Sequence, residues 1–332
     1  MRKKRCAILV MVLVGMMGTA CMKENPVSEW MKEEKTSGKL PAMEPLTGKA
    51  LDHPARPVLM VMVNNHPAAR PQTGLDKADM VYEVLAEGEI TRFSAFYHSE
   101  RSGTVGPVRS VRPYYLDLAE GSRAVVAHAG GSKEAMKEIR TNKAPSLDGI
   151  HEADRWFRRE NFRRPPHNLY TDLGALWEGV KARGYERSKA ITSPYVFDGK
   201  GASSNGKAAS QVNITYHRLY KAGYRYDESL GKYVRYSQGE KQTDRQTDQP
   251  LAMENVVVIT APHRITDRAG HRDVDWEAGG KGMLFQRGKG APIRWKREKG
   301  WIEFLVDGKP APLLPGKTWV NVLPEEGKLT WQ

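Results

Sequence analysis

An uninterrupted apolar run near the start of the chain limits the possible folds more than any other feature. Residues 57–63 are all apolar, with no polar residue at alternate positions. Such a run is typical of a strand that is buried on both faces of a sheet. It ends in the polar turn Asn64-Asn65-His66-Pro67, and in α/β folds ligands bind in loops at the carboxyl ends of buried strands.

The residues that follow alternate between strand and helix patterns. We expect strands at 78–85, 90–98 and 124–128, and helices at 112–118, 133–140 and 172–183. Alternation along the 90–98 strand places Arg92 on the face of Ser94 and Phe96, opposite Thr91 and Phe93. Residues 56–198 are therefore predicted to form an α/β domain with a mixed sheet.

The second half of the chain shows short strand patterns separated by turns. These patterns fall at 212–216, 224–226, 233–236, 256–259, 282–286, 291–296, 302–306 and 318–322. Before them, a polar stretch rich in Gly, Ser and Ala predicts a linker at 199–211. We therefore expect a mostly β domain at 212–325 and an α+β fold class overall.

The N-terminus has the features of an export signal. Basic residues at 2–5 precede an apolar run at 6–17, and small residues precede Cys21. The run is shorter than the ~20 apolar residues that span a membrane. We predict a signal peptide at 1–20 and a tether at 21–55, whose Lys, Glu, Ser, Pro and Gly content favours disorder.

Cys21 is the only cysteine that remains once the signal is removed. Its position after small residues resembles the lipobox of bacterial lipoproteins, although Gly18 stands where a leucine is usual. Two acyl chains on Cys21 would hold the protein stably on the outer face of the cytoplasmic membrane. The alternative is an ordinary secreted protein with a free thiol.

The formal net charge of +13 indicates the class of partner. Outside the cytoplasm, a cationic protein meets anionic wall polymers and lipid head groups. We therefore expect no nucleic-acid partner. The expected partners are the membrane, through the anchor, and an anionic wall polymer or a wall-synthesis protein. A basic surface with no dedicated partner is the alternative.

The segment 103–132 places cations where the backbone is itself positive. Ser110 can cap a helix and Pro113 fits its first turn, so Arg109 and Arg112 lie at the positive end of the helix dipole. Helix N-termini hold anions readily, so we expect either an anion or a carboxylate of this chain between the two arginines.

Further polar residues join this candidate site. The candidates for holding an anion are Arg70, Arg92, Arg109, Arg112, His128 and Ser132, and the acidic or acid–base candidates are Asp79, Glu83 and Glu87. An internal network among these groups, with Ser132 as a plain helix cap, is the alternative. The spacing of His66, His128 and His167 fits no zinc pattern, so we expect no metal and no cofactor.

Several sequence motifs occur together along the chain: Asn64-Asn-His-Pro-Ala-Ala-Arg-Pro-Gln-Thr-Gly-Leu75, Gly106-Pro-Val-Arg-Ser-Val-Arg-Pro113, His128-Ala-Gly-Gly-Ser132, Pro166-His-Asn168 and, later, Asp307-Gly-Lys-Pro310 and Pro315-Gly-Lys-Thr-Trp-Val320. In this combination the chain resembles the YerB-like lipoproteins of Gram-positive bacteria, from about residue 56 to residue 324. The resemblance implies two domains of unknown function and an envelope location, and it implies no reaction.

Two functions remain open at this point. The preferred one is a binding or scaffold lipoprotein that engages an anionic wall component or a wall-synthesis protein. The alternative is an enzyme acting on a phosphorylated glycan or a polyprenyl-phosphate-linked substrate, with Glu83, Glu87 or His128 as acid–base groups or metal ligands. The order of arginines and a later Gly-Gly is similar to that in LytR-CpsA-Psr phosphotransferases, without a shared motif. Unpaired arginines would favour a ligand, and arginines fully paired to carboxylates would favour a scaffold.

Overall fold

The computed structural model describes residues 43–51, 56–142, 144–152, 154–187, 191–268 and 270–332. The predicted signal peptide, Cys21 and most of the predicted tether lie outside the described residues. Residues 43–51 fall within the predicted tether, yet they fold against the following domain. Leu46 is buried in a hydrophobic cluster, and Glu44 is buried with its carboxylate 2.6 Å from Nδ1 of His98. The packed part of the chain therefore begins before residue 56.

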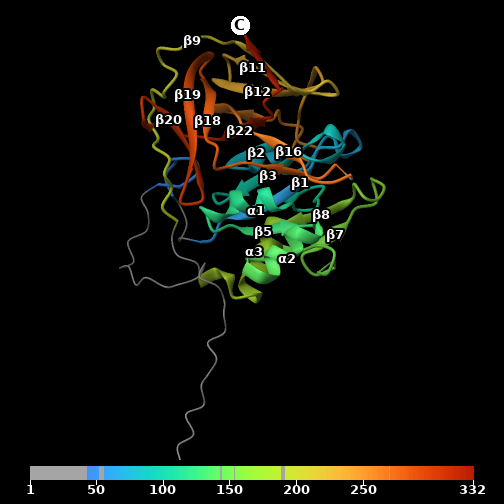
Figure 1. The fold of residues 1–332 in the computed structure, drawn as a ribbon. Helices are drawn as coiled ribbons and strands as arrows, with labels where there is room; N and C mark the ends of the chain where they lie inside the picture. Colours follow the sequence, from blue (N-terminus) through green and yellow to red (C-terminus); the bar gives the residue numbers. More distant parts are fainter. Residues whose placement is uncertain (1–42, 52–55, 143, 153, 188–190, 269) are drawn as a thin grey trace, which may run out of the picture.

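One large mixed sheet runs through the described structure (Figure 1). Its order is β21-β20-β19-β18-β15-β22-β2-β3-β1-β5-β6, with β9 paired to β19. The bounds of these strands are β1 Leu59–Asn64, β2 Met80–Leu85, β3 Thr91–Tyr97, β5 Val125–His128, β6 Ser146–Asp148, β9 Lys207–Ala208, β15 Asn255–Thr260, β18 Gly280–Gln286, β19 Lys289–Glu298, β20 Trp301–Val306, β21 Lys309–Pro310 and β22 Thr318–Leu323.

The two halves of the chain share this sheet. Strand β22, from the C-terminal half, pairs in parallel with β2 on one side and with β15 on the other. All six residues of β1, β2 and β22 are buried, as the uninterrupted apolar run at 57–63 predicts for β1. The sheet therefore crosses the boundary that composition places between two domains.

A second sheet lies against one face of the large sheet and is built from the C-terminal half. Its order is β13-β12-β11-β10-β23, with β14 paired to β12. Its strands are β10 Gln211–His217, β11 Tyr220–Asp227, β12 Lys232–Ser237, β13 Glu240–Lys241, β14 Ala252–Met253 and β23 Lys328–Trp331. Burial alternates along β10 and β11, so one face of this sheet packs inward and the other faces solvent.

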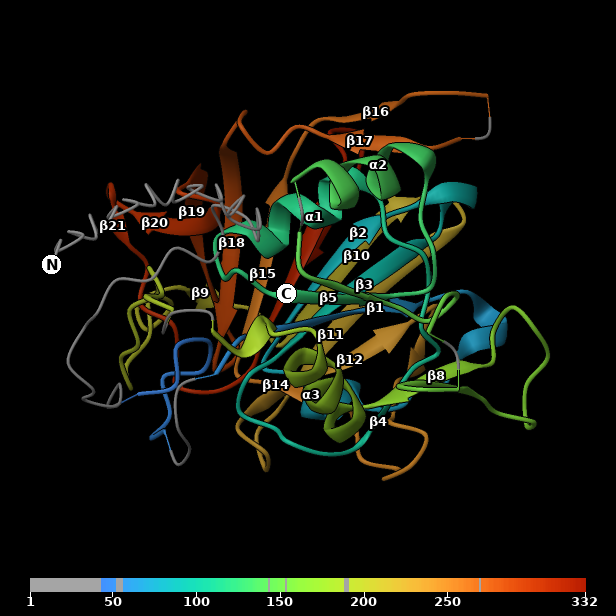
Figure 2. The same cartoon turned by 90° about the horizontal axis from the view of Figure 1, so that it is seen from below.

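Helices cover both faces of the large sheet (Figure 2). Helices α1 Pro113–Glu120 and α2 Lys133–Asn142 lie on one face, and α3 Leu173–Ala182 lies on the face that also carries the second sheet. Tyr114 and Tyr115 of α1 belong to the same buried hydrophobic cluster as Met60 and Met62 of the sheet. Asp172 caps α3, its carboxylate accepting from the Gly174 N–H at 2.8 Å.

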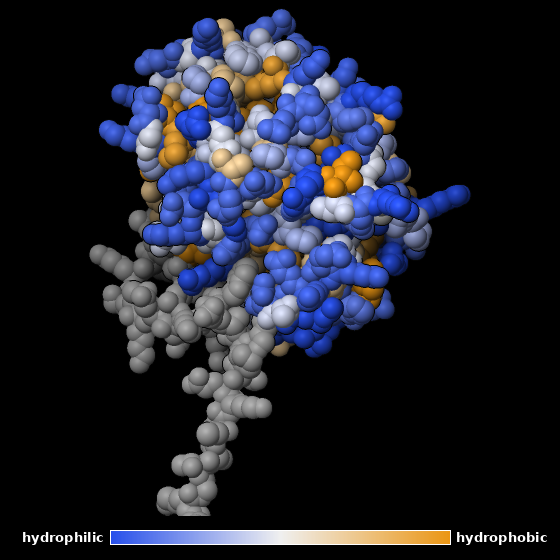
Figure 3. Space-filling view, viewed as in Figure 1, coloured by the Kyte–Doolittle hydropathy of each residue, from blue (hydrophilic) through white to orange (hydrophobic). Residues whose placement is uncertain are grey.

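Smaller elements complete the described structure. A three-stranded sheet has the order β4 Thr104–Val105, β8 Leu169–Asp172, β7 Phe157–Arg159, and a hairpin joins β16 His263–Ile265 to β17 Arg272–Val274. Short 3₁₀ turns occupy Pro67–Ala69, Leu75–Lys77, Glu87–Glu89 and Tyr185–Arg187. Within the described residues, no helix is long and apolar enough to cross a membrane. In the view of Figure 3 the molecular surface is mostly hydrophilic, with scattered apolar patches.

The α+β fold class is confirmed, with a mixed sheet in the N-terminal half and a mostly β C-terminal half. Each of the predicted segments at 112–118, 133–140 and 172–183 contains a helix, and each predicted strand pattern of the second half forms a strand. Phe96 and Phe93 lie on opposite faces of the large sheet, as alternation predicts.

Candidate anion-binding site

The site lies where β1 and β5 separate at their carboxyl ends. The two strands pair in parallel as far as Val61 and Ala127, and residues 107–111 then lie between them. The Arg109 N–H donates to the Met62 carbonyl at 2.8 Å, and the Arg109 carbonyl accepts from the Ala129 N–H at 3.0 Å. The backbone of Arg109 is therefore fixed from both sides at this edge of the sheet.

Glu87 lies between two of the predicted arginines. Its carboxylate is 3.1 Å from Nη2 of Arg92 and also accepts from Nε of Arg112. Arg92 donates in addition to the Ser110 carbonyl at 3.0 Å, and Arg112 to the Val111 carbonyl at 2.7 Å. Burial acts to raise the pKa of Glu87, but the charges of Arg92 and Arg112 outweigh it and hold the pKa below its ordinary value. A carboxylate of this chain therefore pairs with Arg112 and Arg92, and not with the two arginines, Arg109 and Arg112, between which it was expected.

Arg109 is left without a counterion. Among the described residues, its half-buried guanidinium has no hydrogen bond and no ion pair. Burial lowers the pKa of Arg109, and the neighbouring charges of Arg92 and Arg112 lower it further. Two of the three guanidinium groups thus share the Glu87 carboxylate, and the charge of the third, Arg109, is not paired with a carboxylate of the described residues.

Two stacked histidines add donors beside Arg109. The rings of His66 and His167 lie 4.6 Å apart and 18° from parallel. Nδ1 of His66 accepts from the Ala68 N–H at 3.1 Å, so the neutral ring carries its proton on Nε2. Oδ1 of Asn64 accepts from the His66 N–H at 3.0 Å, which leaves its Nδ2 to donate to Nδ1 of His167 at 2.8 Å.

His167 therefore also carries its proton on Nε2. Burial lowers its pKa, and the charges of His66, Arg109 and Arg163 lower it further. Even when both rings are neutral, the Nε2 atom of each is an N–H donor rather than a lone pair. This edge of the sheet consequently offers hydrogen-bond donors, as an oxyanion requires.

His128 and Ser132, two further candidates for holding an anion, make contacts that stabilise the fold. His128 is fully buried, and its Nδ1 is 2.9 Å from the Gly130 carbonyl. Its Nε2 has no partner among the described residues, and burial lowers its pKa. Ser132 accepts from the Ala135 N–H at 3.2 Å and so caps α2, as the alternative interpretation of this residue expects.

Arg70 and Glu83 point between the two sheets rather than to this edge. Arg70 donates to Oδ1 and to the carbonyl of Asn65 and lies over the ring of Tyr220. Glu83 has no exposed surface, and its carboxylate is 2.9 Å from the guanidinium of Arg235. Because Glu83 is sealed and fully paired, it cannot act as an acid or base on a solvent-borne substrate.

Asp79 lies at the opposite end of β2, away from the arginines. Its buried carboxylate accepts from the backbone N–H groups of His98 and Ser99 at 2.5 and 2.9 Å. Burial and then the charge of Glu44 raise its pKa to about 6. Asp79 thus fixes the turn that follows β3 and does not join Glu83 and Glu87 in one acidic group.

Neither Arg235 nor the pairing of His66 with His167 is predicted from the sequence. Arg235 comes from β12, and nothing local in the sequence links it to Glu83. The histidines appear in the sequence only as isolated residues, and the polar turn after β1 was the one signal that pointed to them. In the described part of the chain, no group of three or more His, Cys, Asp or Glu side chains could hold a metal ion.

Comparison with known proteins shows the family to which this chain belongs. Residues 46–186 match the N-terminal domain, and residues 212–320 the C-terminal domain, of a protein of unknown function, DUF3048. The chain is 39% identical to the "Putative lipoprotein YerB" of Bacillus subtilis (strain 168), over 97% of this chain and 96% of that protein. The crystal structure of YerB from Bacillus subtilis is similar, with a TM-score of 0.80 and 38% identity over 87% of this chain and 99% of that one. The chain therefore belongs to the DUF3048 family, which includes YerB.

Proposed function

We propose that this protein is an envelope lipoprotein, anchored through Cys21 to the outer face of the cytoplasmic membrane, that binds an anionic wall component at Arg109. The observation that carries the proposal is that Arg92 and Arg112 share Glu87, while Arg109 has no counterion in the part of the chain that the structure describes. A half-buried guanidinium beside two others is stabilised by a bound phosphate or carboxylate, which it can grip with two parallel N–H bonds.

The N-terminal sequence and the name of the relative support the anchor. The basic, apolar and small residues that precede Cys21 form an export signal with a cysteine at its end. Changing Cys21→Ser in cells should release the protein from the membrane fraction into the medium. Membrane retention of the Cys21→Ser protein would overturn the lipid anchor.

Calorimetric titration with inorganic pyrophosphate tests the anion site. The wild-type protein, from residue 22 onward, should bind pyrophosphate, and Arg109→Ala should weaken binding by at least tenfold, about 1.4 kcal/mol. The matched control is Arg101→Ala, because Arg101 is exposed and away from the site. Equal affinity of wild type and Arg109→Ala, or no binding to either, would contradict the proposal.

An enzymatic function receives less support from the geometry. Glu83 is sealed in its ion pair, Glu87 is held by two arginines, and His128 is fully buried. The residues that remain accessible are hydrogen-bond donors, which bind and orient an anion. Binding is therefore the function that we propose.

A further inference from the structure

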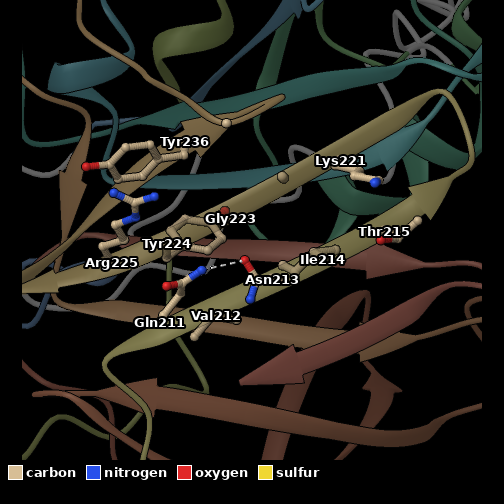
Figure 4. Close-up of a pocket in the computed structure, with 12 residues that line it drawn as sticks. Gln211, Val212, Asn213, Ile214, Thr215, Lys221, Gly223, Tyr224, Arg225 and Tyr236 are labelled. Atoms are coloured by element: carbon tan, nitrogen blue, oxygen red, sulfur yellow. Dashed lines mark hydrogen bonds between the residues drawn. The ribbon is translucent and has the colours of Figure 1, made fainter. Parts of the chain in front are cut away.

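The solvent-facing side of the second sheet carries a groove that the anion site does not use (Figure 4). It has a volume of about 220 Å³ and runs along β11, between β10 and β12. Gly223 lies in the middle of its floor, where the absence of a side chain leaves the hollow. Gly223 pairs with Asn213 on one side and with Tyr236 on the other, so these residues form the walls.

The groove is cationic at both ends. Lys221 and Arg225 are exposed and flank Gly223, two residues before it and two residues after it, on the same face of β11. Four residues of extended strand separate them, which is about 13 Å at ~3.3 Å per residue. The guanidinium of Arg225 lies 4.5 Å from the centre of the Tyr236 ring, and this contact fixes its direction. None of the described residues that line the groove is acidic.

Between the two cations the lining is polar and uncharged. Nε2 of Gln211 donates to Oδ1 of Asn213 at 3.1 Å, and this leaves the Asn213 amide nitrogen and the Gln211 oxygen for a ligand. Thr215 adds a hydroxyl group. The amides and the hydroxyl group can form hydrogen bonds with the many hydroxyl groups of a sugar.

We propose that this groove binds an elongated glycan that carries anionic groups, at a second site distinct from the Arg109 edge. The two cations would receive carboxylates or phosphates at either end, and the amides would bind sugar hydroxyls between them. An acidic peptide fits less well. The main chains of β10, β11 and β12 are all paired on both sides, so they offer no free strand edge for a peptide backbone to join.

Titration of the protein with three probes tests the assignment. The probes are a polygalacturonate oligosaccharide, the uncharged maltotetraose and a hexa-glutamate peptide. We expect the anionic oligosaccharide to bind, with at least fivefold higher affinity than either of the other two. Equal binding of the peptide would overturn the glycan assignment, and equal binding of maltotetraose would overturn the role of the cations.

Variants locate the binding. Arg225→Gln should weaken binding of the anionic oligosaccharide at least fivefold, because it removes the positive charge at one end of the groove. Arg225 is exposed, so its substitution should not disturb the fold. The matched control is Arg294→Gln, an exposed arginine on β19, which should bind as the wild type does. Arg109→Ala separates the groove from the anion site: a loss of binding in Arg109→Ala that Arg225→Gln does not share would place the oligosaccharide at the anion site. Wild-type affinity in Arg225→Gln would refute the proposal.

Discussion

The carboxylate of Glu83 lies 2.9 Å from the guanidinium of Arg235, and the two side chains are 0% and 1% exposed. Glu83 belongs to β2 of the large sheet and Arg235 to β12 of the second sheet. Thr91, Tyr220 and Trp319 donate to the same carboxylate at 2.8–3.1 Å. The ring of Trp319 also lies 4.8 Å from the guanidinium. This pair therefore connects the two sheets through a fully satisfied buried charge network.

Removing one partner of this pair should destabilise the protein strongly. Glu83→Gln leaves the Arg235 charge buried and unpaired, which typically costs about 3–5 kcal/mol. Urea unfolding measures this loss. The control Glu240→Gln, at an exposed position on β13, should change the free energy of unfolding by less than about 0.5 kcal/mol.

The double variant Glu83→Gln/Arg235→Gln sharpens this test. It should lose less than the sum of the two single variants, because the second substitution removes the charge that the first leaves unpaired. Additive losses would show that the two side chains stabilise the protein independently.

Two neighbouring arginines should respond differently to substitution. Arg112→Ala breaks the partly buried contact with Glu87 and should cost about 1–3 kcal/mol. Arg109→Ala removes a cation that makes no ion pair among the described residues and that the charges of Arg92 and Arg112 oppose, and should change the free energy of unfolding by no more than about 0.5 kcal/mol in either direction. Chemical denaturation without added anion compares them. A large loss in Arg109→Ala would mean that Arg109 supports the fold.

The stability of the wild type should fall, relative to Asp79→Asn, as the pH rises from about 4 to 7. The pKa of Asp79 is raised to about 6 in the folded protein by burial and by Glu44. A carboxyl with a raised pKa stabilises the fold fully below its unfolded pKa of about 4, and this contribution is lost as the pH rises through about 6.

Over this pH range the free energy of unfolding of the wild type should fall by roughly 1–3 kcal/mol relative to that of Asp79→Asn, as measured by urea unfolding at several pH values. The control Asp248→Asn, at an exposed loop position, should show no such trend. A constant difference between wild type and Asp79→Asn across this range would show that the pKa of Asp79 is not raised.

Local patterns predicted the elements of this fold but not how they meet. The apolar run at 57–63 forms β1, and the Gly-Gly-Ser turn opens α2. The insertion of β22 beside β2 joins residues more than 200 positions apart, and no local pattern marks such a partner. In the same way the sequence identified Arg109 and Arg112 as a pair. Only the packed structure shows that Glu87 pairs with Arg112 and that Arg109 has no counterion among the residues that the structure describes.

Nitrogen-15 NMR of the imidazole groups tests the anion site most directly. In the free protein, His66 and His167 should both show protonated Nε2 and unprotonated Nδ1 when neutral. Inorganic pyrophosphate should raise the pKa of His167 by about one unit, because a nearby anion favours the charged ring. The same titration in Arg109→Ala should show a much smaller rise. A His167 titration curve that pyrophosphate leaves unchanged in the wild type would contradict an anion site at this edge of the sheet.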